Sequence, residues 1–452
     1  MINSLIDQAK KLHFIGIGGS GMFPIVQIMH SRGYAISGSD NNEGDTINLE
    51  RNMGIDVHIG HAPENLGDAD LVIYSAAIMA DNPELAAARD RGIPALERSE
   101  VLGYLTSQYD NCIAISGTHG KTTTTAMLTQ MLLGAGLDPT AVIGGKLPLI
   151  GGNGRAGQSD LMVVEACEYV DTFLHLFPDI AVILNVDEDH LEYFKNLDNI
   201  IASFRKFAAM ATKSIVVNGD DANSLRAVDG LNKPIITFGL GEANDYRAVD
   251  IQKTGPASYD FSLVQRGKNL GILTLNVPGE HNILNALAAC AAALEAGAEF
   301  GAIAEHLPQF RGAGRRFEML GTVNGIQIAD DYAHHPAELT VTLNAAKAMG
   351  YNRVWAVFQP FTYSRTSLLL DDFAEALSIA DRVVMSKIMG AREKNTYNIF
   401  TSDLAAKIPG SVWFEEFPEI AEYVMANAQP GDLVITLGCG DVYKCARLML
   451  KD

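Results

Sequence analysis

The sequence predicts an α/β protein built from three domains. Its 452 residues correspond to roughly three domains of about 150 residues each. Short apolar runs alternate with helical patterns along the chain, which is typical of βα repeats around parallel or mixed sheets. We expect a Rossmann-like domain over residues 1–108, a central domain of the phosphate-loop type over 109–312, and a second Rossmann-like domain over 313–452.

Composition and charge exclude several classes of partner. The chain is 48 % hydrophobic and 19 % charged, with a formal net charge of -20. Nucleic acids and anionic membranes bind mainly through Lys and Arg, so we expect neither as a partner. The N-terminus lacks the pattern of a signal peptide, and no run of 18 apolar residues occurs. We therefore expect a cytoplasmic protein without membrane insertion, as a monomer or a homodimer.

The cysteines indicate a reducing compartment. Their number is odd and no two form a CxxC pair, which favours free thiols over a disulfide framework. Most of them are expected to be small core residues. The five are Cys112, Cys167, Cys290, Cys439 and Cys445.

A glycine turn near the N-terminus predicts a nucleotide-binding βαβ unit. The stretch "KLHFIGIGGSGMFPIVQIMHSRGYAISGSD" gives a strand over 12–17, a helix that ends near Ser31, a strand over 35–38, and then Asp40. The spacing G-x-G-G-x-G is tighter than G-x-G-x-x-G and indicates a nucleotide diphosphate without specifying NAD. A further strand near 70–75 ends in small residues at Ser75, as a ligand crevice would.

The stretch "SGTHGKTTTTAML" predicts a phosphate-binding loop. It follows a buried strand over 112–115 and precedes apolar residues at helical spacing over 126–133. Backbone N–H groups at a helix N-terminus attract phosphate, Lys121 would reach the outer phosphates, and Thr122 would hold a magnesium ion. The strict motif requires Gly where Ile115 stands, so a glycine turn capped by threonines is the alternative.

Carboxylates follow two further strands, over 161–164 and 180–184. Glu165 and Glu168 end the first strand, and Asp187, Asp189 and His190 come after the second. Hard oxygen donors beside a phosphate loop are suited to a magnesium ion and its surroundings. A solvated acidic turn is the alternative interpretation of the residues 187–190.

Two other polar groups are candidates for ligand contact. Asn282 and Asn285 lie at the start of a strongly helical stretch, where polar side chains either cap the helix or contact a ligand, and the residues alone leave both open. In the third domain, a basic cluster at predicted strand ends is suited to an anion. This cluster comprises Arg315, Arg316, Asp330, Asp331, His334, His335 and Arg365.

Seven motifs in order resemble the Mur ligase family, the ATP-dependent amino-acid ligases of peptidoglycan precursor synthesis. They are "GIGGSGM", "SGTHGKTTTT", "VEACEY", "GEHNILNA", "GRRFE", "DDYAHHP" and "FQPFTYSRT". The family's phosphate loop is the shorter G-T-x-G-K-T form, which accounts for Ile115. The chain is most similar to alanine-adding members, and this implies a reaction of ATP, UDP-N-acetylmuramate and L-alanine that gives ADP, phosphate and an amide-linked product.

The resemblance also implies a role for individual residues. Catalytic roles fall to Lys121, Glu165, His190, His335 and Arg365. Magnesium contacts are implied for Thr122, Glu165 and His190. ATP contacts are implied for Gly117, Thr118, His119, Gly120, Lys121, Thr122, Thr123, Asn282, Asn285, Arg316 and Asp331. Contacts with the UDP-sugar are implied for Gly18, Gly19, Ser20, Gly21, Met22, Asp40 and Ser75.

Two positions depart from the family pattern, and three other functions are kept open. Phe361 stands where relatives often carry His, and Cys439 where Ala is common. Some sister ligases use a carbamylated lysine as a metal ligand, but we assign no such role to Lys206. The alternatives are a recycling ligase that attaches a tripeptide to the same sugar, a Rossmann oxidoreductase that binds NAD, and a non-catalytic nucleotide-binding regulator.

Overall fold

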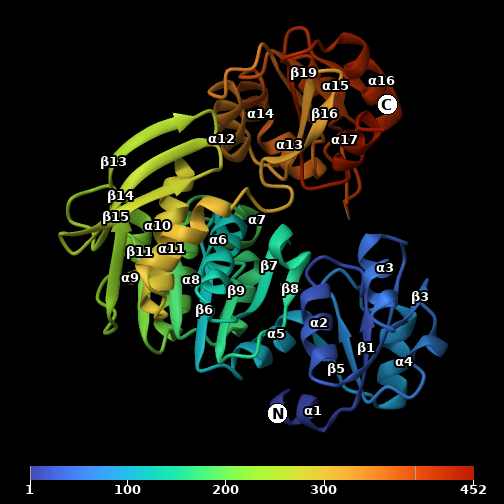
Figure 1. Ribbon diagram of the computed structural model, residues 1–452. Coiled ribbons are helices and arrows are strands. Elements are labelled where there is room, and N and C mark those ends of the chain that lie inside the picture. Colours follow the sequence, from blue (N-terminus) through green and yellow to red (C-terminus); the bar gives the residue numbers. More distant parts are fainter. Residues whose placement is uncertain (1, 392, 452) are drawn as a thin grey trace. The chain divides into compact units, whose positions relative to one another are not determined.

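The computed structural model describes residues 2–391 and 393–451. Within these residues, three sheets and their flanking helices confirm the α/β class (Figure 1). The chain divides into two compact units. The first unit comprises Met1–Asp250, Phe261–Leu273 and Leu284–Gln309, and the second comprises Ile251–Asp260, Thr274–Ile283 and Phe310–Asp452. The domain boundaries expected at residues 108 and 312 stay predictions.

The first sheet has five parallel strands. Its elements are α1 (Ile2–Gln8), β1 (Lys11–Ile15), α2 (Phe23–Ser31), β2 (Ala35–Asp40), α3 (Asp45–Asn52), β3 (Asp56–Ile59), η1 (Pro63–Leu66), β4 (Leu71–Tyr74), α4 (Pro83–Arg91), β5 (Ala95–Glu97) and α5 (Arg98–Thr106). The strand order is β3-β2-β1-β4-β5. Because β1 is central and pairs in parallel with β2 and β4, the turns that follow these three strands lie at one edge of the sheet.

The central sheet has ten strands in the order β15-β14-β13-β12-β11-β10-β6-β9-β7-β8. Its strands are β6 (Asn111–Ser116), β7 (Thr140–Leu147), β8 (Gly152–Arg155), β9 (Leu161–Glu165), β10 (Ile180–Ile183), β11 (Ser214–Asn218), β12 (Ile235–Gly239), β13 (Tyr246–Gly255), β14 (Ser258–Gln265) and β15 (Lys268–Leu275). Strand β6 lies between β10 and β9 and is parallel to both.

Helices and short turns connect the strands of the central sheet. They are α6 (Lys121–Gly134), η2 (Pro148–Ile150), η3 (Tyr169–His175), α7 (Leu191–Phe194), α8 (Leu197–Met210), α9 (Ala222–Val228), α10 (His281–Glu295), α11 (Phe300–His306) and η4 (Leu307–Gln309). Helix α6 packs on β7 and β9, and α8 packs on β10. The helix after the phosphate loop therefore lies over the strands that follow β6 in the sheet order.

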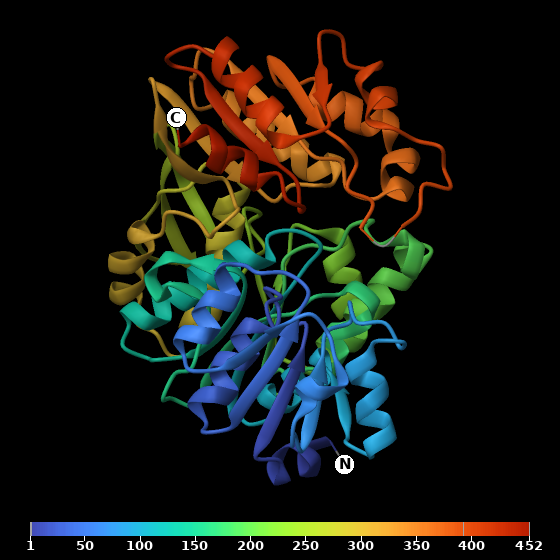
Figure 2. The same ribbon diagram turned by 90° about the vertical axis from the view of Figure 1, so that its right-hand side faces the viewer.

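The third sheet has six strands in the order β16-β17-β21-β18-β19-β20. The elements around it (orange to red in Figure 2) are β16 (Glu318–Val323), β17 (Ile326–Asp331), α12 (Pro336–Lys347), β18 (Val354–Phe358), α13 (Tyr363–Leu368), α14 (Leu370–Leu377), β19 (Arg382–Ser386), α15 (Thr401–Ala405), β20 (Val412–Phe414), α16 (Phe417–Asn427), β21 (Leu433–Leu437) and α17 (Tyr443–Met449). Strands β17, β21, β18, β19 and β20 run parallel, and β16 is antiparallel to β17.

Strand β18 shows why this sheet is covered on both faces. All five of its residues are buried. Ala356 and Phe358 pack in one cluster with residues of α12 and α14, whereas Trp355 and Val357 pack in another with residues of α16 and α17. Alternate side chains of a strand point to opposite faces, so a continuous apolar run requires helices on both sides. Among the described residues, every helix is too short or too polar to cross a bilayer.

A buried polar network fastens α4 to the first sheet. The Glu84 carboxylate accepts from the Ser39 hydroxyl at 2.5 Å and from the Asn65 amide at 2.6 Å, and it lies 3.4 Å from His13 Nε2. The side chain of Glu84 is fully buried. Burial alone would raise the pKa of Glu84, but hydrogen bonds from His13, Ser39 and Asn65 outweigh it and lower this pKa to about 2.

We predict that this network makes the protein sensitive to acid. The pKa of Glu84 falls from an ordinary 4.5 to about 2 on folding. Its contribution is therefore present above about pH 4.5 and disappears as the pH falls towards about 2, with a size on the order of 3 kcal/mol. Glu84→Gln should flatten this part of the pH dependence of the unfolding free energy, measured by denaturant titration. The exposed Glu64→Gln should not, and equal slopes for both variants would contradict the assignment.

Candidate active site

The predicted phosphate loop joins the end of β6 to the start of α6. Helix α6 begins at Lys121, and Gly120 before it has φ 86°. A Cβ at Gly120 would stand only 2.4 Å from Oδ1 of Asn285, so this position requires glycine. The structure thus places Asn285, from α10, against the loop.

Lys121 is held by its own loop and by a carboxylate. Its Nζ donates to the carbonyl oxygens of Gly117 at 2.5 Å and Thr118 at 3.0 Å, and it lies 2.9 Å from Oε2 of Glu168. Burial alone would lower the pKa of Lys121, but Glu168 chiefly, with Cys167 and Glu165, outweighs it and raises this pKa. Lys121 is therefore a fixed positive charge at the start of the helix.

Asn185, which follows β10, fixes the other side of the loop. Its side chain exchanges two hydrogen bonds with the backbone of His119, at 2.8 Å and 3.1 Å. The hydroxyl of Thr118 accepts from the backbone N–H of Asp187 at 2.9 Å. These bonds set the conformation of the loop through the neighbouring strand. Thr123 lies half-buried in the first turn of α6.

Thr122 and Glu165 meet beside Lys121, as their predicted metal role requires. The Thr122 hydroxyl donates to Oε1 of Glu165 at 3.0 Å, and Oε2 of Glu165 accepts from the backbone N–H of Gly144 at 2.7 Å. A hydroxyl and a carboxylate are hard oxygen donors and fit Mg²⁺ chemically. Within the described part of the chain, no three His, Cys, Asp or Glu side chains form a cluster that would hold a metal without such a hydroxyl.

His190 lies at the start of α7 in the left-handed conformation, with φ 53°. Its ring centroid is 4.6 Å from that of Tyr169, and its Nε2 is 3.7 Å from the carboxylate of Asp189. The imidazole thus lies between this carboxylate and the tilted ring of Tyr169. The magnesium role of His190 stays a prediction.

The glycine turn after β1 is closed by the acidic residue that the sequence singled out. The backbone N–H of Gly18 donates to Oδ2 of Asp40 at 3.1 Å. Ser75 adjoins the same turn, since its N–H donates to the carbonyl of Ile15, the residue before the turn, at 3.2 Å. The structure therefore brings Gly18, Asp40 and Ser75 to one strand edge, as expected of a nucleotide site.

The remaining residues of this turn differ in which of their groups are already bound or buried within the protein. Gly19 accepts from the N–H of Met22 at 2.8 Å, and the Met22 side chain is buried in the core. The side chain of Met22 is thus not available to a ligand. The Ser20 carbonyl accepts from Asn153 at 2.7 Å. A Cβ on Gly21 would lie 3.5 Å from Nη1 of Arg98, which places a cation beside the turn.

In the second unit, the basic cluster gathers at the carboxyl ends of three parallel strands. Asp331 of β17 pairs with Leu437 of β21, which pairs with Phe358 of β18. His334 and His335 follow β17, Arg365 lies in α13 after β18, and Arg315 and Arg316 lie just before β16. Arg315 donates to Asp330 at 2.9 Å and stacks over Tyr332, with 4.9 Å from its Cζ to the ring centroid.

Arg316, His335 and Arg365 complete this cluster. The Cζ of Arg316 lies 5.0 Å from the ring centroid of Tyr332. His335 caps α12, where its Nδ1 accepts from the N–H of Ala337 at 3.4 Å. Arg365 lies in α13, and its positive charge acts on His334. The pKa of His334 is lowered chiefly by burial and also by the charges of Arg365 and Arg316. Glu338 favours the protonated ring, but its effect is smaller.

Asp331 is a buried carboxyl within the cluster. It accepts from the backbone N–H groups of Phe317 and Ala333, both at 2.7 Å. Burial raises the pKa of Asp331 to about 6, although Arg316 and the two N–H groups oppose the shift. Asp331 therefore orders the segment that carries Arg316.

The other open positions take local roles in the structure. Asn282 donates to the carbonyl of Pro278 at 2.7 Å and so secures the start of α10. Phe361 forms an isolated bridge with Met389, next to the third sheet. Burial raises the pKa of Cys439 to about 12. All five cysteines are free thiols, as expected.

The sequence predicted Glu168 as an oxygen donor near a magnesium ion and not as the partner of Lys121, and it indicated no role for Asn185 or Arg98. Glu168 pairs with Lys121, Asn185 holds the phosphate loop, and Arg98 adjoins the glycine turn. Glu168 and Asn185 each follow a buried strand that adjoins β6. Their position after these strands could have predicted that they lie near the phosphate loop. Arg98 opens a helix that follows a three-residue strand, which gives little pattern to read.

The fold and these sites together define a nucleotide-binding enzyme of the phosphate-loop class, with a second nucleotide-type turn in its N-terminal sheet. Family models match three successive parts of the chain: "Mur ligase family, catalytic domain" over 11–110, "Mur ligase middle domain" over 115–293, and "Mur ligase, glutamate ligase domain" over 315–440. The chain belongs to the Mur ligase family.

Similar proteins support the same placement. The UDP-N-acetylmuramate–L-alanine ligase of Caldanaerobacter subterraneus subsp. tengcongensis is 43% identical over 99% of this chain and 98% of its own. That of Acetivibrio thermocellus is 44% identical with the same coverage. Among solved structures, the UDP-N-acetylmuramate-alanine ligase of Thermotoga maritima aligns with a TM-score of 0.84 at 29% identity over 98% of both chains.

We predict that Arg316→Ala raises the pKa of Asp331 above its value of about 6. The guanidinium stabilises the ionised carboxylate, so its removal leaves burial less opposed. A carbon-detected NMR titration of the Asp331 carboxyl would measure the shift. Lys387→Ala, which removes an exposed cation elsewhere in the same unit, is the control. An unchanged or lower pKa in Arg316→Ala would contradict the assigned interaction.

Proposed function

We propose that this Mur ligase joins L-alanine to the lactyl carboxylate of UDP-N-acetylmuramate at the expense of ATP, in peptidoglycan precursor synthesis. The observation that carries the proposal is the convergence of Lys121, Thr122 and Glu165 at one phosphate loop. Relatives that are 42% to 44% identical over nearly the whole chain bear the corresponding name. ATP and a nucleotide sugar are cytoplasmic compounds, so the proposal includes a cytoplasmic location.

The chemistry requires activation of the carboxylate before the amide forms. A carboxylate is a poor acyl donor because its oxygen leaves badly. Its attack on the γ-phosphorus breaks the bond to ADP and gives an acyl phosphate. The amine of alanine then attacks the acyl carbon, and the C–N bond forms as a tetrahedral intermediate. The nitrogen loses a proton, the C–O bond to the phosphate group breaks, and inorganic phosphate leaves.

Lys121 lowers the repulsion between the two anions that must react. Its ammonium group already has three oxygen partners, the carbonyls of Gly117 and Thr118 and the carboxylate of Glu168. Phosphate oxygens would replace some of these partners at small reorganisation, because the charge is fixed in place beforehand. Mg²⁺ held by Thr122 and Glu165, with His190 as a third proposed ligand, would neutralise charge on the transferred phosphoryl group.

The N-terminal glycine turn is the proposed site for the UDP part. Asp40 fixes the turn through Gly18, and Arg98 supplies a positive charge beside Gly21. A pyrophosphate needs a cation near the turn, and Arg98 supplies one. In the second unit, Arg316, His335 and Arg365 are the proposed contacts for the nucleotide and the reacting groups.

The recycling ligase that attaches a tripeptide remains the second candidate. A murein peptide ligase from Psychrobacter arcticus aligns with a TM-score of 0.77 at 25% identity over 98% of both chains. The higher identity of the alanine ligases favours alanine as the acceptor. The oxidoreductase alternative leaves Lys121 and the basic cluster without a function. A non-catalytic regulator would not need Lys121, Thr122, Glu165 and His190 together.

Phosphate release should require both UDP-N-acetylmuramate and L-alanine. The physical reason is that the acyl phosphate forms on the sugar acid and is consumed only by the amine. A coupled phosphate assay with alanine, glycine, serine and the tripeptide in competition would measure this dependence. ATP turnover that is indifferent to the sugar and to the amino acid would contradict the proposal, and a preference for the tripeptide would favour the recycling ligase.

Lys121→Ala should lower kcat by about a thousandfold or more, the size of comparable electrostatic terms in transition-state stabilisation. Circular dichroism and a melting curve would establish that the variant is folded. Lys407→Ala, which removes an exposed lysine paired with Asp371, should keep normal turnover. Turnover at the original rate in Lys121→Ala would remove the phosphate-loop assignment.

Arg98→Ala should raise the KM for the UDP-sugar about tenfold while the KM for ATP changes little. Loss of one charge-assisted hydrogen bond to a phosphate is worth about 1.5 kcal/mol. Steady-state kinetics with each substrate varied in turn would separate the two constants. Arg89→Ala, on the exposed side of α4, is the matched control. Equal effects on both substrates would argue against a pyrophosphate contact.

A further inference from the structure

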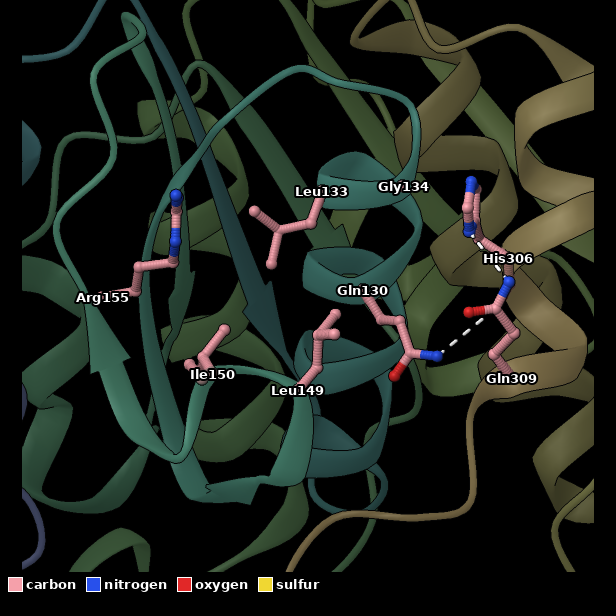
Figure 3. Close-up of a pocket in the computed structure, with 8 residues that line it drawn as sticks. All are labelled: Gln130, Leu133, Gly134, Leu149, Ile150, Arg155, His306 and Gln309. Atoms are coloured by element: carbon pink, nitrogen blue, oxygen red, sulfur yellow. Dashed lines mark hydrogen bonds between the residues drawn. The ribbon is translucent and has the colours of Figure 1, made fainter.

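A pocket of about 430 Å³ lies at the end of α6 remote from the phosphate loop. Helix α6 has 14 residues, so its two ends are roughly 20 Å apart. The pocket is lined by the last turns of α6, by η2 and β8, and by residues at the end of α11 and in η4 (Figure 3). Its volume lies in the range of small-molecule sites, 300 Å³ or more by general experience. None of the residues assigned to ATP, metal or UDP-sugar lines it.

One wall of the pocket is fixed by close packing. The ring of His306 lies against Gly134, where a Cβ would stand 2.1 Å from the ring Cγ, so only glycine fits. Gln309 Nε2 lies 3.1 Å from Nδ1 of His306, and Gln130 Nε2 donates to the His306 carbonyl at 3.4 Å. Figure 3 shows both amides directed at His306. The pocket wall is therefore formed before any ligand binds.

The lining combines an apolar floor with donors of hydrogen bonds. Leu133, Leu149 and Ile150 supply the apolar part, and Leu149 is 58% exposed. An amide N–H donates to Nδ1 of His306, so the neutral ring carries its proton on Nε2 and offers it as a donor. Large apolar side chains beside fixed polar groups are typical of ligand sites.

The charges of the pocket favour an anion. The chain has 54 acidic residues, yet none lines the pocket, and its two ionisable groups are Arg155 and His306. Arg155 is anchored by an ion pair with Asp138 and by a hydrogen bond of 2.8 Å to the carbonyl of Pro139. This anchoring fixes the guanidinium and moderates its charge, which is suited to a singly charged group rather than to a polyphosphate.

Two elements connect this pocket to the proposed active site. Helix α6 begins with Lys121 and ends at Gly134 in the pocket. The hairpin β7–η2–β8 carries Leu149 in the pocket, donates the Gly144 N–H to Glu165, and donates the Asn153 amide to the Ser20 carbonyl of the glycine turn. A ligand that contacts both elements could thus affect the phosphate loop at Lys121 and the glycine turn at Ser20.

We propose that this pocket is a regulatory site for a small organic anion with an apolar body. The apolar body would lie on Leu133, Leu149 and Ile150, and the anionic group would face Arg155. His306, on the opposite side of the pocket in Figure 3, would meet a second polar group of the ligand. Occupancy changes the affinity for ATP through α6 and the hairpin, and by linkage ATP changes the affinity for the anion by the same factor.

The first test uses anilinonaphthalene sulfonate, an aromatic sulfonate whose fluorescence rises on apolar burial, with the full-length protein. In the presence of a saturating non-hydrolysable ATP analogue and UDP-N-acetylmuramate, we expect one saturable site per chain. Leu149→Asp should weaken binding about tenfold, because it removes apolar contact and repels the sulfonate. Leu240→Asp, at a leucine 46% exposed in a turn of the same unit, should leave binding unchanged.

A milder variant guards against a failure of Leu149→Asp to fold. Gln309→Glu keeps the shape of an exposed side chain, adds a negative charge at the pocket, and should weaken binding about threefold. Gln108→Glu, also at an exposed glutamine, is its control. Full competitive displacement of the probe by the ATP analogue, beyond the finite change in affinity that linkage allows, would overturn the proposed site. Equal binding in the pocket variants and their controls would also overturn it.

The second test concerns the coupling. Saturating probe should change the KM for ATP at least twofold in the wild-type protein and in Leu240→Asp, and not in Leu149→Asp. This test depends on ATP turnover, whereas the fluorescence titration does not, so failure of the proposed ligase reaction leaves the binding test intact. Binding at the pocket with an unchanged KM for ATP would overturn the regulatory role.

Discussion

The structure of the central domain depends on placing a buried lysine beside carboxylates at the start of a helix. Lys121 loses most of its contact with water, which is tolerable only because Glu168 and two loop carbonyls surround its ammonium group. The pairing of β6 with β9 provides this arrangement, since Ile115 lies opposite Glu165 in the parallel register. One strand thus supplies the loop and its neighbour supplies the carboxylates.

The two glycine turns are held in shape by different side chains, and their cations come from different places. At the end of β1, the N–H of Gly18 is already bound by Asp40, so the turn is held in shape by a carboxylate and the nearest cation comes from Arg98. At the end of β6, the cation is part of the loop and Asn185 holds the backbone instead. Both turns follow central strands of parallel sheets, where ligands bind at the carboxyl edge.

Local features of the site could be predicted from the sequence, whereas its pairings could not. The βαβ unit at Asp40 and the strand before Lys121 are encoded in contiguous residues whose patterns are strong. The helix itself begins at Lys121, five residues before the apolar residues at helical spacing start at Ala126. The four threonines in its first turns carry no apolar pattern, so the sequence did not show this start. The partner of Lys121 depends on which strands flank β6, and strand order is a property of distant contacts.

The placement of positive charge explains how so acidic a chain binds anions. The net charge of -20 repels anions at long range. Close to the sites, however, each cation is oriented by a specific neighbour: Lys121 by Glu168, Arg315 by Asp330, and Arg316 by the ring of Tyr332. A cationic side chain that is already oriented loses little conformational entropy when a phosphate binds. Where its partner is a carboxylate, the phosphate replaces only part of the contact between the two side chains. The few oriented cations thus offer local positive charge to anions that fit their geometry, although the chain as a whole is acidic.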